Sequence, residues 1–373
     1  MSAIQDDQNK IESGDARKPH TPDSGSHHTQ DKEGIMGETD ALEAHGRANF
    51  SRLGWKRLTV ILLVEAIALG ALSIPGAFAT LGMVAGVILT VGVGLIAIYT
   101  SHIIGQVKLA FPHVAHYADA GRLLMGRFGY ELVGAMFALE LTFLVGSHCL
   151  TGTIAFLNLS NNGACSVVFG VVSAIILLVL AIPPSFADVA ILGYIDFVSI
   201  MAAIGITIVA TAVVSGSSAG AFGVALPVIF ISGSINCTVV ARYIHGRVYK
   251  NSVVRFINTK KGWLTWLGLI SFLTIIAWVI AEAIPFFSDL LSIMSALFVS
   301  GFTFYFPAMM WFMLIKKGKW YARENLFLSV VNGAVFVIGI VVLVGGTYAA
   351  VEDIKNQYAE GTVRGAFTCA PIS

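Results

Sequence analysis

Long apolar runs fill the chain beyond residue 57, and short basic or Gly-, Pro- and Ser-containing segments separate them. A helix needs about 20 apolar residues to cross the hydrocarbon of a bilayer. Because backbone groups in lipid must find hydrogen-bond partners within their own segment, these runs predict membrane-spanning helices. Nine spans are expected, at residues 58–81, 83–107, 131–157, 167–182, 189–214, 222–244, 263–284, 289–315 and 325–350.

The composition supports this reading. Charged residues make up 12% of the 373 residues, whereas soluble domains carry about a quarter. So few charges cannot cover a globular surface, which excludes an ordinary soluble enzyme, a nucleic-acid-binding protein and a secreted disulfide scaffold. The expected fold class is an all-α polytopic membrane protein with a transmembrane domain at residues 56–350. Polar residues 1–55 are expected to form a disordered cytoplasmic tail, and residues 351–373 a short non-cytoplasmic C-terminal tail.

Lys and Arg predict the orientation of the spans, because they are enriched in cytoplasmic segments. If the chain crosses at each span, 21 of the 23 basic residues fall on one face, including those up to Arg57. The N-terminus is therefore predicted to be cytoplasmic. Cys165 and Cys369 both fall on the outer side, where thiols oxidise, so a bridge between them is a hypothesis. Cys149 and Cys237 lie within spans and are expected to be packing residues.

Ionisable side chains inside spans are costly and so indicate function. The acids inside the expected spans are Glu65, Glu140, Asp196 and Glu282, and Asp188 and Asp289 lie at span ends. His148 is the histidine at mid-span. Glu140 and His148 lie eight residues apart, about two helical turns, and are a candidate proton-relay pair. For each acid the alternative is neutralisation by a neighbouring helix without any role in transport. No set of ligands or nucleophiles converges, so no enzyme activity, cofactor or metal site is expected.

The stretch EAIALGALSIPGAF at residues 65–78 is the most informative part of the chain. Pro75 lacks an N–H group and removes a helical hydrogen bond, and Gly70 leaves helical geometry cheaply. A helix broken at mid-membrane exposes amides that suit a carboxylate and carbonyls that suit a cation, which is a way to bind a zwitterion. The alternative is a plain proline kink with small residues for close helix packing. The candidate binding segment is Gly70, Ala71, Leu72, Ser73, Ile74 and Pro75.

Three blocks carry a resemblance to a known family, at residues 65–86 (EAIALGALSIPGAFATLGMVAG), 235–249 (INCTVVARYIHGRVY) and 263–312. They resemble the amino acid/auxin permease family, in particular the fungal neutral and aromatic amino acid permeases related to the methyltryptophan-resistance protein. The resemblance implies an inverted-repeat fold of about eleven spans whose members move amino acids together with protons. It also implies that the first helix is unwound between Gly70 and Pro75, and that Glu65 is a proton- or cation-linked group.

One departure from the family pattern concerns residues 214–222. Family members carry two further helices there, including the second broken helix of the substrate site, whereas this chain passes directly into a span resembling the family's eighth. The chain is therefore expected to lack two internal helices. Removing two helices preserves the alternation of sides, so the charge pattern does not reveal the loss.

These observations lead to two hypotheses. The first is a permease for neutral aliphatic or aromatic amino acids that works by proton-coupled symport. The amides of residues 71–73 would hold the carboxylate, Ser234 and Asn236 would form a polar wall, and Glu65, Glu140 and His148 would handle protons. The second is a truncated form that does not transport but regulates or associates with a full-length permease. Either would be a multi-pass protein of the plasma or vacuolar membrane, with the lipid bilayer and not nucleic acid as its partner.

Overall fold

The computed structural model describes residues 55–184, 186–213, 219–250, 252–257, 259–284, 287–360, 365 and 367–369. All regular structure in these residues is helical, and no strand occurs among them. The N-terminal tail up to residue 54 and the junction at 214–218, both subjects of predictions above, lie outside the described residues.

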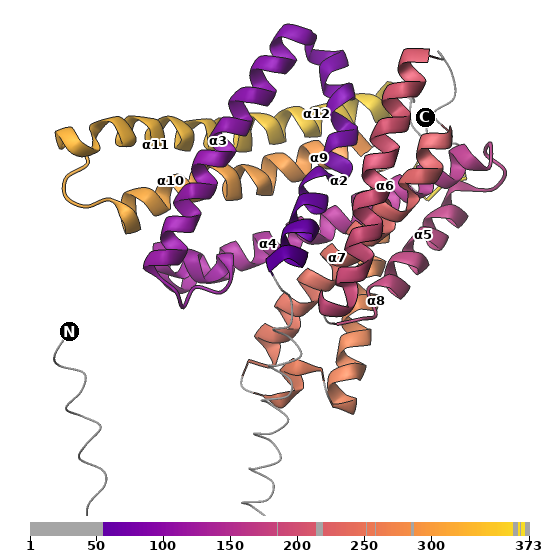
Figure 1. Cartoon of the computed structure of the whole chain (residues 1–373), viewed down its shortest axis with the longest axis horizontal. Helices are drawn as coiled ribbons and strands as arrows, with labels where there is room; N and C mark the ends of the chain where they lie inside the picture. The colour runs from indigo at the N-terminus through magenta and orange to yellow at the C-terminus, as the bar shows by residue number, and fades with distance from the viewer. Residues whose placement is uncertain are drawn as a thin grey trace, which may run out of the picture. The chain divides into compact units, whose positions relative to one another are not determined.

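Every expected span corresponds to a helix or a run of consecutive helices (Figure 1). Seven of them are long and apolar enough to cross a membrane, judged by length and composition over the described residues. The helices are α2 (Trp55–Leu81), α3 (Met83–Ala110), α4 (Tyr117–Leu159), α5 (Ser166–Leu180), α6 (Phe186–Val213), α7 (Ala219–Val248), α8 (Lys260–Ala283), α9 (Phe287–Met294), α10 (Phe306–Met310), α11 (Arg323–Val341) and α12 (Thr347–Glu360). The π-helical segments η2 (Ser295–Val299), η3 (Gly301–Tyr305), η4 (Trp311–Ile315) and η5 (Val342–Gly346) connect or extend the last of these, and η1 (Val253–Phe256) precedes α8.

The predicted break in the first helix is absent from the structure. Helix α2 is helical throughout from Trp55 to Leu81, with Pro75 inside it. One proline removes a single donor from the hydrogen-bond ladder. A continuous helix keeps the remaining amides and carbonyls paired, which is the less costly solution where water is excluded. This corrects the expectation that residues 70–75 are unwound here.

Helices α2 and α3 are joined by the single residue Gly82. Its φ of 77° lies in the left-handed region that favours glycine. A Cβ atom at Gly86 on α3 would lie 2.9 Å from the Phe78 ring of α2. The two helices therefore pack closely next to their connection.

Helix α4 begins well before the expected span at 131. Asp119 accepts hydrogen bonds from the backbone N–H groups of Ala115 and His116, and the His116 side chain caps the helix in return. The helix is kinked at Met125 and Gly126, where Gly126 has a φ of 63°. Residues 117–130, which precede the expected span, are therefore helical, and a capping box at His116 and Asp119 begins the helix.

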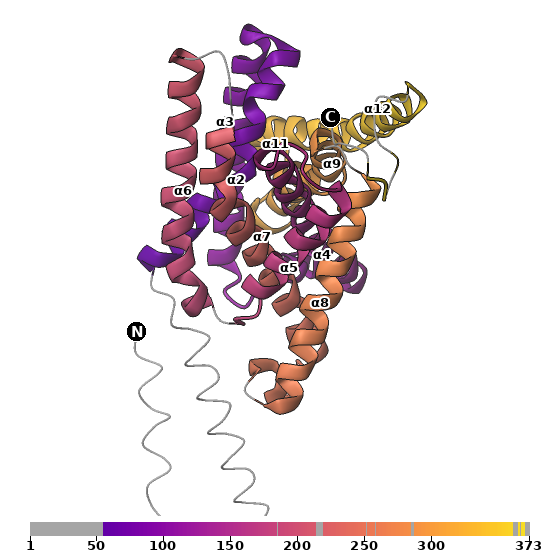
Figure 2. The same ribbon diagram turned by 90° about the vertical axis from the view of Figure 1, so that its right-hand side faces the viewer.

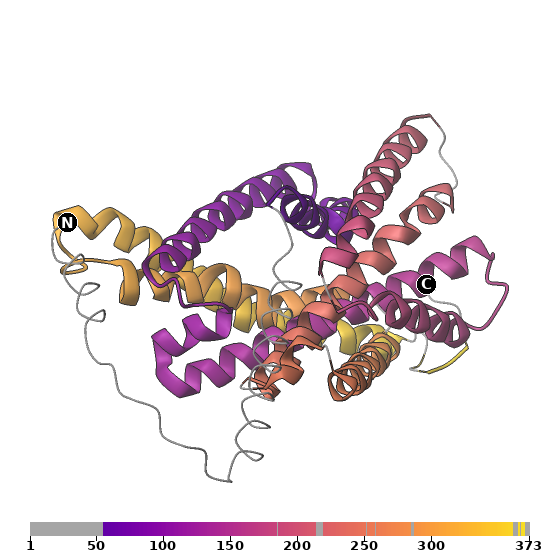
Figure 3. The same cartoon turned by 60° about the horizontal axis from the view of Figure 1, so that its bottom comes forward.

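The main core lies between helices α4 to α8, with Val64 of α2 added at its edge. Leu150, Ile229 and Ile270 are almost fully buried there. Helix α6 lies beside both α2 and α7 (Figure 2), and helix α3 crosses the segment of residues 301–315 (Figure 3). A second apolar cluster joins α3 and the start of α4 to α10 and η4.

The last helix continues past the predicted end of the ninth span at residue 350. Helix α12 runs to Glu360, where Gln357 donates a hydrogen bond of 2.7 Å to Asp289 and the Tyr358 hydroxyl donates one of 3.1 Å to the Ala283 carbonyl. These contacts with α8 and α9 order part of the segment predicted to be a tail.

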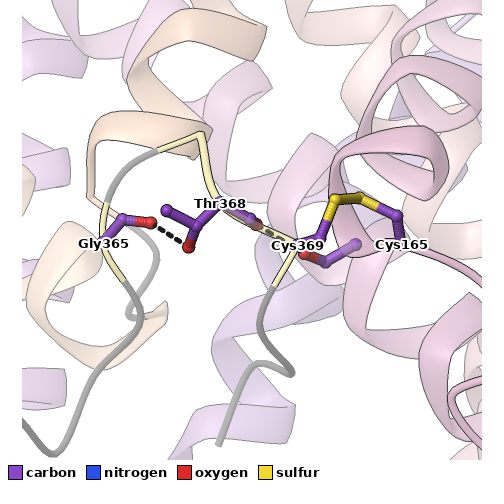
Figure 4. Close-up of a disulfide and its surroundings, with 5 residues drawn as sticks. Cys165, Gly365, Thr368 and Cys369 are labelled. Carbon is purple, nitrogen blue, oxygen red and sulfur yellow. Dashed lines mark hydrogen bonds between the residues drawn. A yellow bond between two sulfur atoms is a disulfide. The ribbon is translucent and has the colours of Figure 1, made fainter.

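Cys165 and Cys369 form a disulfide, as hypothesised, with their Cα atoms 4.8 Å apart (Figure 4). The Ser166 hydroxyl donates to the Thr368 carbonyl at 3.2 Å, and the Phe367 ring packs edge-on against Trp278. The bridge requires both cysteines to lie on the same side of the membrane. The six expected spans between them satisfy this requirement, because an even number of crossings returns the chain to the same side.

Candidate functional site

Glu65 on α2 lies against α7 and is bonded to two of its side chains. The Ser232 hydroxyl donates to Glu65 Oε2 at 2.7 Å, and Asn236 Nδ2 donates to Glu65 Oε1. Ser232 and Asn236 are buried. Both carboxylate oxygens are thus satisfied by neutral donors within the part of the protein that spans the membrane.

The helical repeat of α7 explains this arrangement. Residues four apart lie on the same face of a helix, so Ser232 and Asn236 point together toward α2. Asn236 Nδ2 also donates to the Ser232 carbonyl at 3.1 Å, which fixes the orientation of the amide. Ile61, Ile231 and Ile235 form a small apolar cluster beside the polar group.

Asp196 on α6 is the second carboxyl of this region. Its side chain is fully buried, and neither of its oxygens has a hydrogen-bond partner among the described residues. It lies close enough to Glu65 for the two charges to interact. The interface of α2, α6 and α7 therefore holds two carboxyl groups and two neutral donors.

The two residues expected to form a polar wall have other roles in this structure. The Asn236 side chain donates its hydrogen bond to Glu65. The Ser234 hydroxyl is buried and donates at 2.7 Å to the Ile231 carbonyl of its own helix. Ser232, which the sequence analysis did not single out, is the hydroxyl that faces the carboxylate, and its spacing of four from Asn236 was the available signal.

The binding segment expected on α2 lies at an exposed part of the helix. Ile74 is 43% exposed, and Pro75 and Gly76 are also exposed. A Cβ atom added at Gly70 would meet nothing within 4 Å. Ile74, Pro75 and Gly76 therefore lie at an exposed surface of α2 and not in the wall of an enclosed site.

Glu140 and His148 have different surroundings, although they share helix α4. Glu140 lies near Tyr117 at the start of the same helix. The Tyr117 hydroxyl donates to the Phe302 carbonyl at 2.9 Å. His148 is buried against α7, where its Cβ would lie 2.7 Å from a Cβ added at Gly233. No contact found among the described residues joins the two proposed members of a relay.

Glu282 on α8 is buried beside α5, where its Oε1 would lie 2.6 Å from a Cβ at Gly170. No group of three or more His, Cys, Asp or Glu side chains within the described ranges is arranged to hold a metal ion.

A cavity of about 670 Å³ lies elsewhere, between α9 with η2 and η5 with α12. Asp289, Ser295, Tyr348 and Asp353 are among its lining residues. It includes neither the α2 segment nor the residues around Glu65, so it is not the expected amino acid site.

Comparison with known proteins identifies the family to which this helical architecture belongs. The model of a family described as transmembrane amino acid transporter protein matches residues 51–227 and 215–352. The N amino acid transport system protein of Neurospora crassa is 46% identical over 454 aligned positions, which cover 94% of this chain and 96% of the relative. Proteins named transmembrane transporter from Fusarium pseudograminearum and Gibberella moniliformis are 25% and 24% identical, over 87% of this chain. No solved structure matches the chain.

The family match extends from α2 to residue 352, near the start of α12, and includes the buried carboxyl site between α2, α6 and α7. It agrees with an all-helical, multi-pass membrane protein. The chain belongs to the transmembrane amino acid transporter family.

Proposed function

We propose that the protein carries neutral aliphatic or aromatic amino acids across a membrane by proton-coupled symport, with Glu65 as the proton carrier. Family membership and the name of the Neurospora relative support amino acid transport. The observation that carries the proton coupling is the Glu65 carboxyl, held by Ser232 and Asn236 within membrane-spanning helices.

The two donors to Glu65 differ in a way that suits a proton carrier. A serine hydroxyl donates to a carboxylate and accepts from a carboxylic acid, whereas an amide NH₂ group only donates. The second hydrogen bond of Asn236 Nδ2, to the Ser232 carbonyl, fixes the NH₂ group on the side of Glu65. A proton taken up by Glu65 therefore resides on Oε2, where Ser232 reverses its hydrogen bond and keeps the pair satisfied.

The proposed carboxylate site remains the backbone of Gly70, Ala71, Leu72, Ser73, Ile74 and Pro75. In the structure these residues belong to the continuous helix α2. Substrate binding by these amides therefore requires a state in which α2 opens near Pro75, where one hydrogen bond is already missing. Glu65 lies at the inner edge of that segment, so opening the helix would disturb the contact between α2 and α7.

Uptake measurements test this proposal directly. The full chain is expressed in cells that lack their own neutral amino acid permeases, and uptake of labelled leucine and phenylalanine is followed at several external pH values. We expect uptake that is lost with a protonophore and, in Glu65→Gln, uptake that no longer depends on pH. If the correctly inserted protein shows only background uptake, or if Glu65→Gln keeps the pH profile, the proposal is overturned.

A second function, supported by a separate observation, is a truncated form that associates with a full-length permease. The alignment to the Neurospora relative has 454 positions, 81 more than the chain's 373 residues. The family model matches in two pieces that overlap at residues 215–227, as expected if internal helices are missing at this junction. Co-purification with a full-length relative, without uptake by this chain alone, would support the second function over the first.

The transcript offers a further check on the junction. Intervening coding sequence across codons 210–225 would restore the two helices and remove the reason for the second function. For the orientation we propose a cytoplasmic N-terminus in the plasma or vacuolar membrane, based on the distribution of Lys and Arg. Protease protection of an N-terminal tag in sealed vesicles tests this orientation.

A further inference from the structure

The side chain of Asp196 has no role in the proposed function, yet it lies in an environment that is unfavourable for a charged carboxylate. It is fully buried, and both of its oxygens lack hydrogen-bond partners among the described residues. An ionised carboxylate without partners in an apolar interior costs far more free energy than the neutral acid. The site therefore needs either a proton on Asp196 or a compensating group.

The packing of α2 on α6 brings this side chain to Glu65. A Cβ atom added at Gly193 of α6 would lie 3.0 Å from Ile61 Cγ1 of α2. Glu65 follows Ile61 by four residues and Asp196 follows Gly193 by three, so both acids lie one turn further along the same faces. As the first and fifth spans, the two helices run in the same direction, and the charges of the two acids interact.

We propose that Glu65 and Asp196 hold one proton between them, and that Asp196 carries it while Glu65 is ionised. Two adjacent carboxyl groups cannot both be charged in a buried site without a large repulsion. The hydrogen bonds decide which of them is charged: Ser232 and Asn236 donate to Glu65, and no described residue donates to Asp196. Asp196 is thus a positioning residue that sets the charge Glu65 can hold.

Other titratable groups lie on the helices around the Glu65 and Asp196 pair. Helix α4 brings His148 to Gly233, the neighbour of Ser232 on α7. Helix α5 has no acidic or basic side chain and no histidine. Apart from the cysteine thiols, the other ionisable groups on α2, α6, α7 and the helices packed against them are Lys56 and Arg57 on α2, Tyr99, His102 and Lys108 on α3, Tyr117, Asp119, Arg122, Arg127, Tyr130, Glu131 and Glu140 on α4, Asp188 and Tyr194 on α6, Arg242, Tyr243, His245 and Arg247 on α7, and Lys260, Lys261 and Glu282 on α8. The side chains that bond Glu65 are Ser232 and Asn236.

The proton balance of the pair is simple. In the resting pair, Asp196 is neutral and Glu65 carries one negative charge. A proton from water on one side of the membrane forms an O–H bond at Glu65 Oε2 and neutralises the pair, and Ser232 then accepts instead of donating. Release of that proton to water on the other side restores the charge. The use of this cycle in transport rests on the proposed function, whereas the sharing of one proton does not.

Infrared difference spectroscopy on the purified full-length protein tests the sharing without any transport. At neutral pH we expect the carbonyl-stretch band of a protonated buried carboxyl that shifts when aspartate is labelled with ¹³C at its carboxyl carbon. Asp196→Asn should remove this band, and Asp289→Asn, at the other buried aspartate of the described residues, should leave it in place. The isotope label limits the band to aspartate side chains, so its absence from the wild-type protein overturns the proposal without any variant.

A titration of the same spectra tests the coupling. Interacting acids take up protons in two macroscopic steps that belong to the pair. We expect two separate steps in the wild type and one in each variant. The step in Asp196→Asn should lie close to the lower wild-type step, because Glu65 titrates beside a neutral side chain in both proteins. The step in Glu65→Gln should lie at least about one pH unit below the upper wild-type step, because Asp196 then releases its proton without a charged neighbour. The inference is overturned if no aspartate band exists at neutral pH, or if the step that remains in Glu65→Gln coincides with the upper wild-type step. Absent uptake with an intact band and two steps would instead contradict only the proposed function.

Discussion

The Ser232 hydroxyl on α7 donates a hydrogen bond of 2.7 Å to Glu65 Oε2 on α2, which joins side chains 167 residues apart in the chain. Two positions further along α7, Ser234 donates instead to the Ile231 carbonyl of its own helix. The two serines are chemically identical and almost equally buried, so they form a matched pair for testing the site.

Replacing each serine by alanine separates the contact with Glu65 from the general cost of removing a buried hydroxyl. Ser232→Ala leaves Glu65 Oε2 without its donor and should lower the free energy of unfolding by about 1.5–3 kcal/mol, since hydrogen bonds to charged groups fall in that range. Ser234→Ala frees a carbonyl that remains in the helical ladder and should cost less than about 1 kcal/mol. Thermal unfolding in detergent measures both, and equal losses would contradict the assigned contacts.

Gly233 should not tolerate a larger side chain. A Cβ atom there would lie 2.6 Å from Leu177 Cδ2 and 2.7 Å from His148 Cβ, so helices α4, α5 and α7 would have to separate. We expect Gly233→Ala to destabilise the protein by about 1–3 kcal/mol. Gly268→Ala on α8 is the control, because a Cβ there meets nothing within 4 Å. It should leave the stability unchanged or raise it by about 0.5–1 kcal/mol; a comparable loss in both variants would argue against the packing of α7.

The Cys165–Cys369 bridge should hold two fragments together after a cut between them. A protease site placed in the segment between α7 and α8 leaves a single band on a non-reducing gel and two bands after reduction. Cys165→Ser should give two bands under both conditions and lower the stability by about 2–4 kcal/mol. Cys149→Ser changes a buried free thiol and should keep the fragments linked; separation of the wild-type fragments without reductant would contradict the bridge.

His116 should make the stability of the protein sensitive to acid. Burial lowers the pKa of His116, the nearby Asp119 opposes this, and the positive charges of Arg255, Arg242 and Lys108 lower the pKa further. The neutral ring also accepts a hydrogen bond at the start of α4. Because the pKa in the folded protein lies below the unfolded value, the stabilisation is present above the unfolded pKa of about 6.5 and is lost as the pH falls through the folded pKa.

The measurement compares melting temperatures at several pH values for the wild type and His116→Asn. We expect the wild-type melting temperature to fall between about pH 7 and pH 5. Asparagine retains an acceptor for the cap but does not titrate, so the variant should show a smaller fall. Parallel profiles for the two proteins would remove His116 from the acid response.

The sequence predicted the helices and their order well, because apolar runs of membrane length leave the backbone few alternatives. It also predicted the cysteine pair, which follows from counting the sides of the spans. It did not predict the helical start of α4 or the length of α12, because these segments are polar and are ordered by contacts such as Asp119 with the backbone at 115–116 and Gln357 with Asp289.

At the candidate site, the sequence identified Glu65 and Asn236 but not their relationship. The break expected at Gly70–Pro75 is absent, because the strength of a helix interruption depends on partners that no local pattern reveals. Ser232 was missed although it lies four residues before Asn236, because this spacing places both side chains on one face of α7 but does not reveal which helix that face meets. Which buried acids meet likewise depends on how α2 packs on α6.

The one-residue connection at Gly82 links the carboxyl site to the surrounding lipid. Helix α3 exposes Met83, Val84, Ile88, Leu95 and Ile98, each at least 63% accessible. Because only one residue separates the two helices, α2 cannot tilt or slide without moving α3. Any displacement of Glu65 with α2 therefore also displaces α3. Bilayer thickness and acyl-chain order act on the exposed apolar surface of α3. Through the connection at Gly82, they therefore influence how readily Glu65 approaches or leaves Asp196.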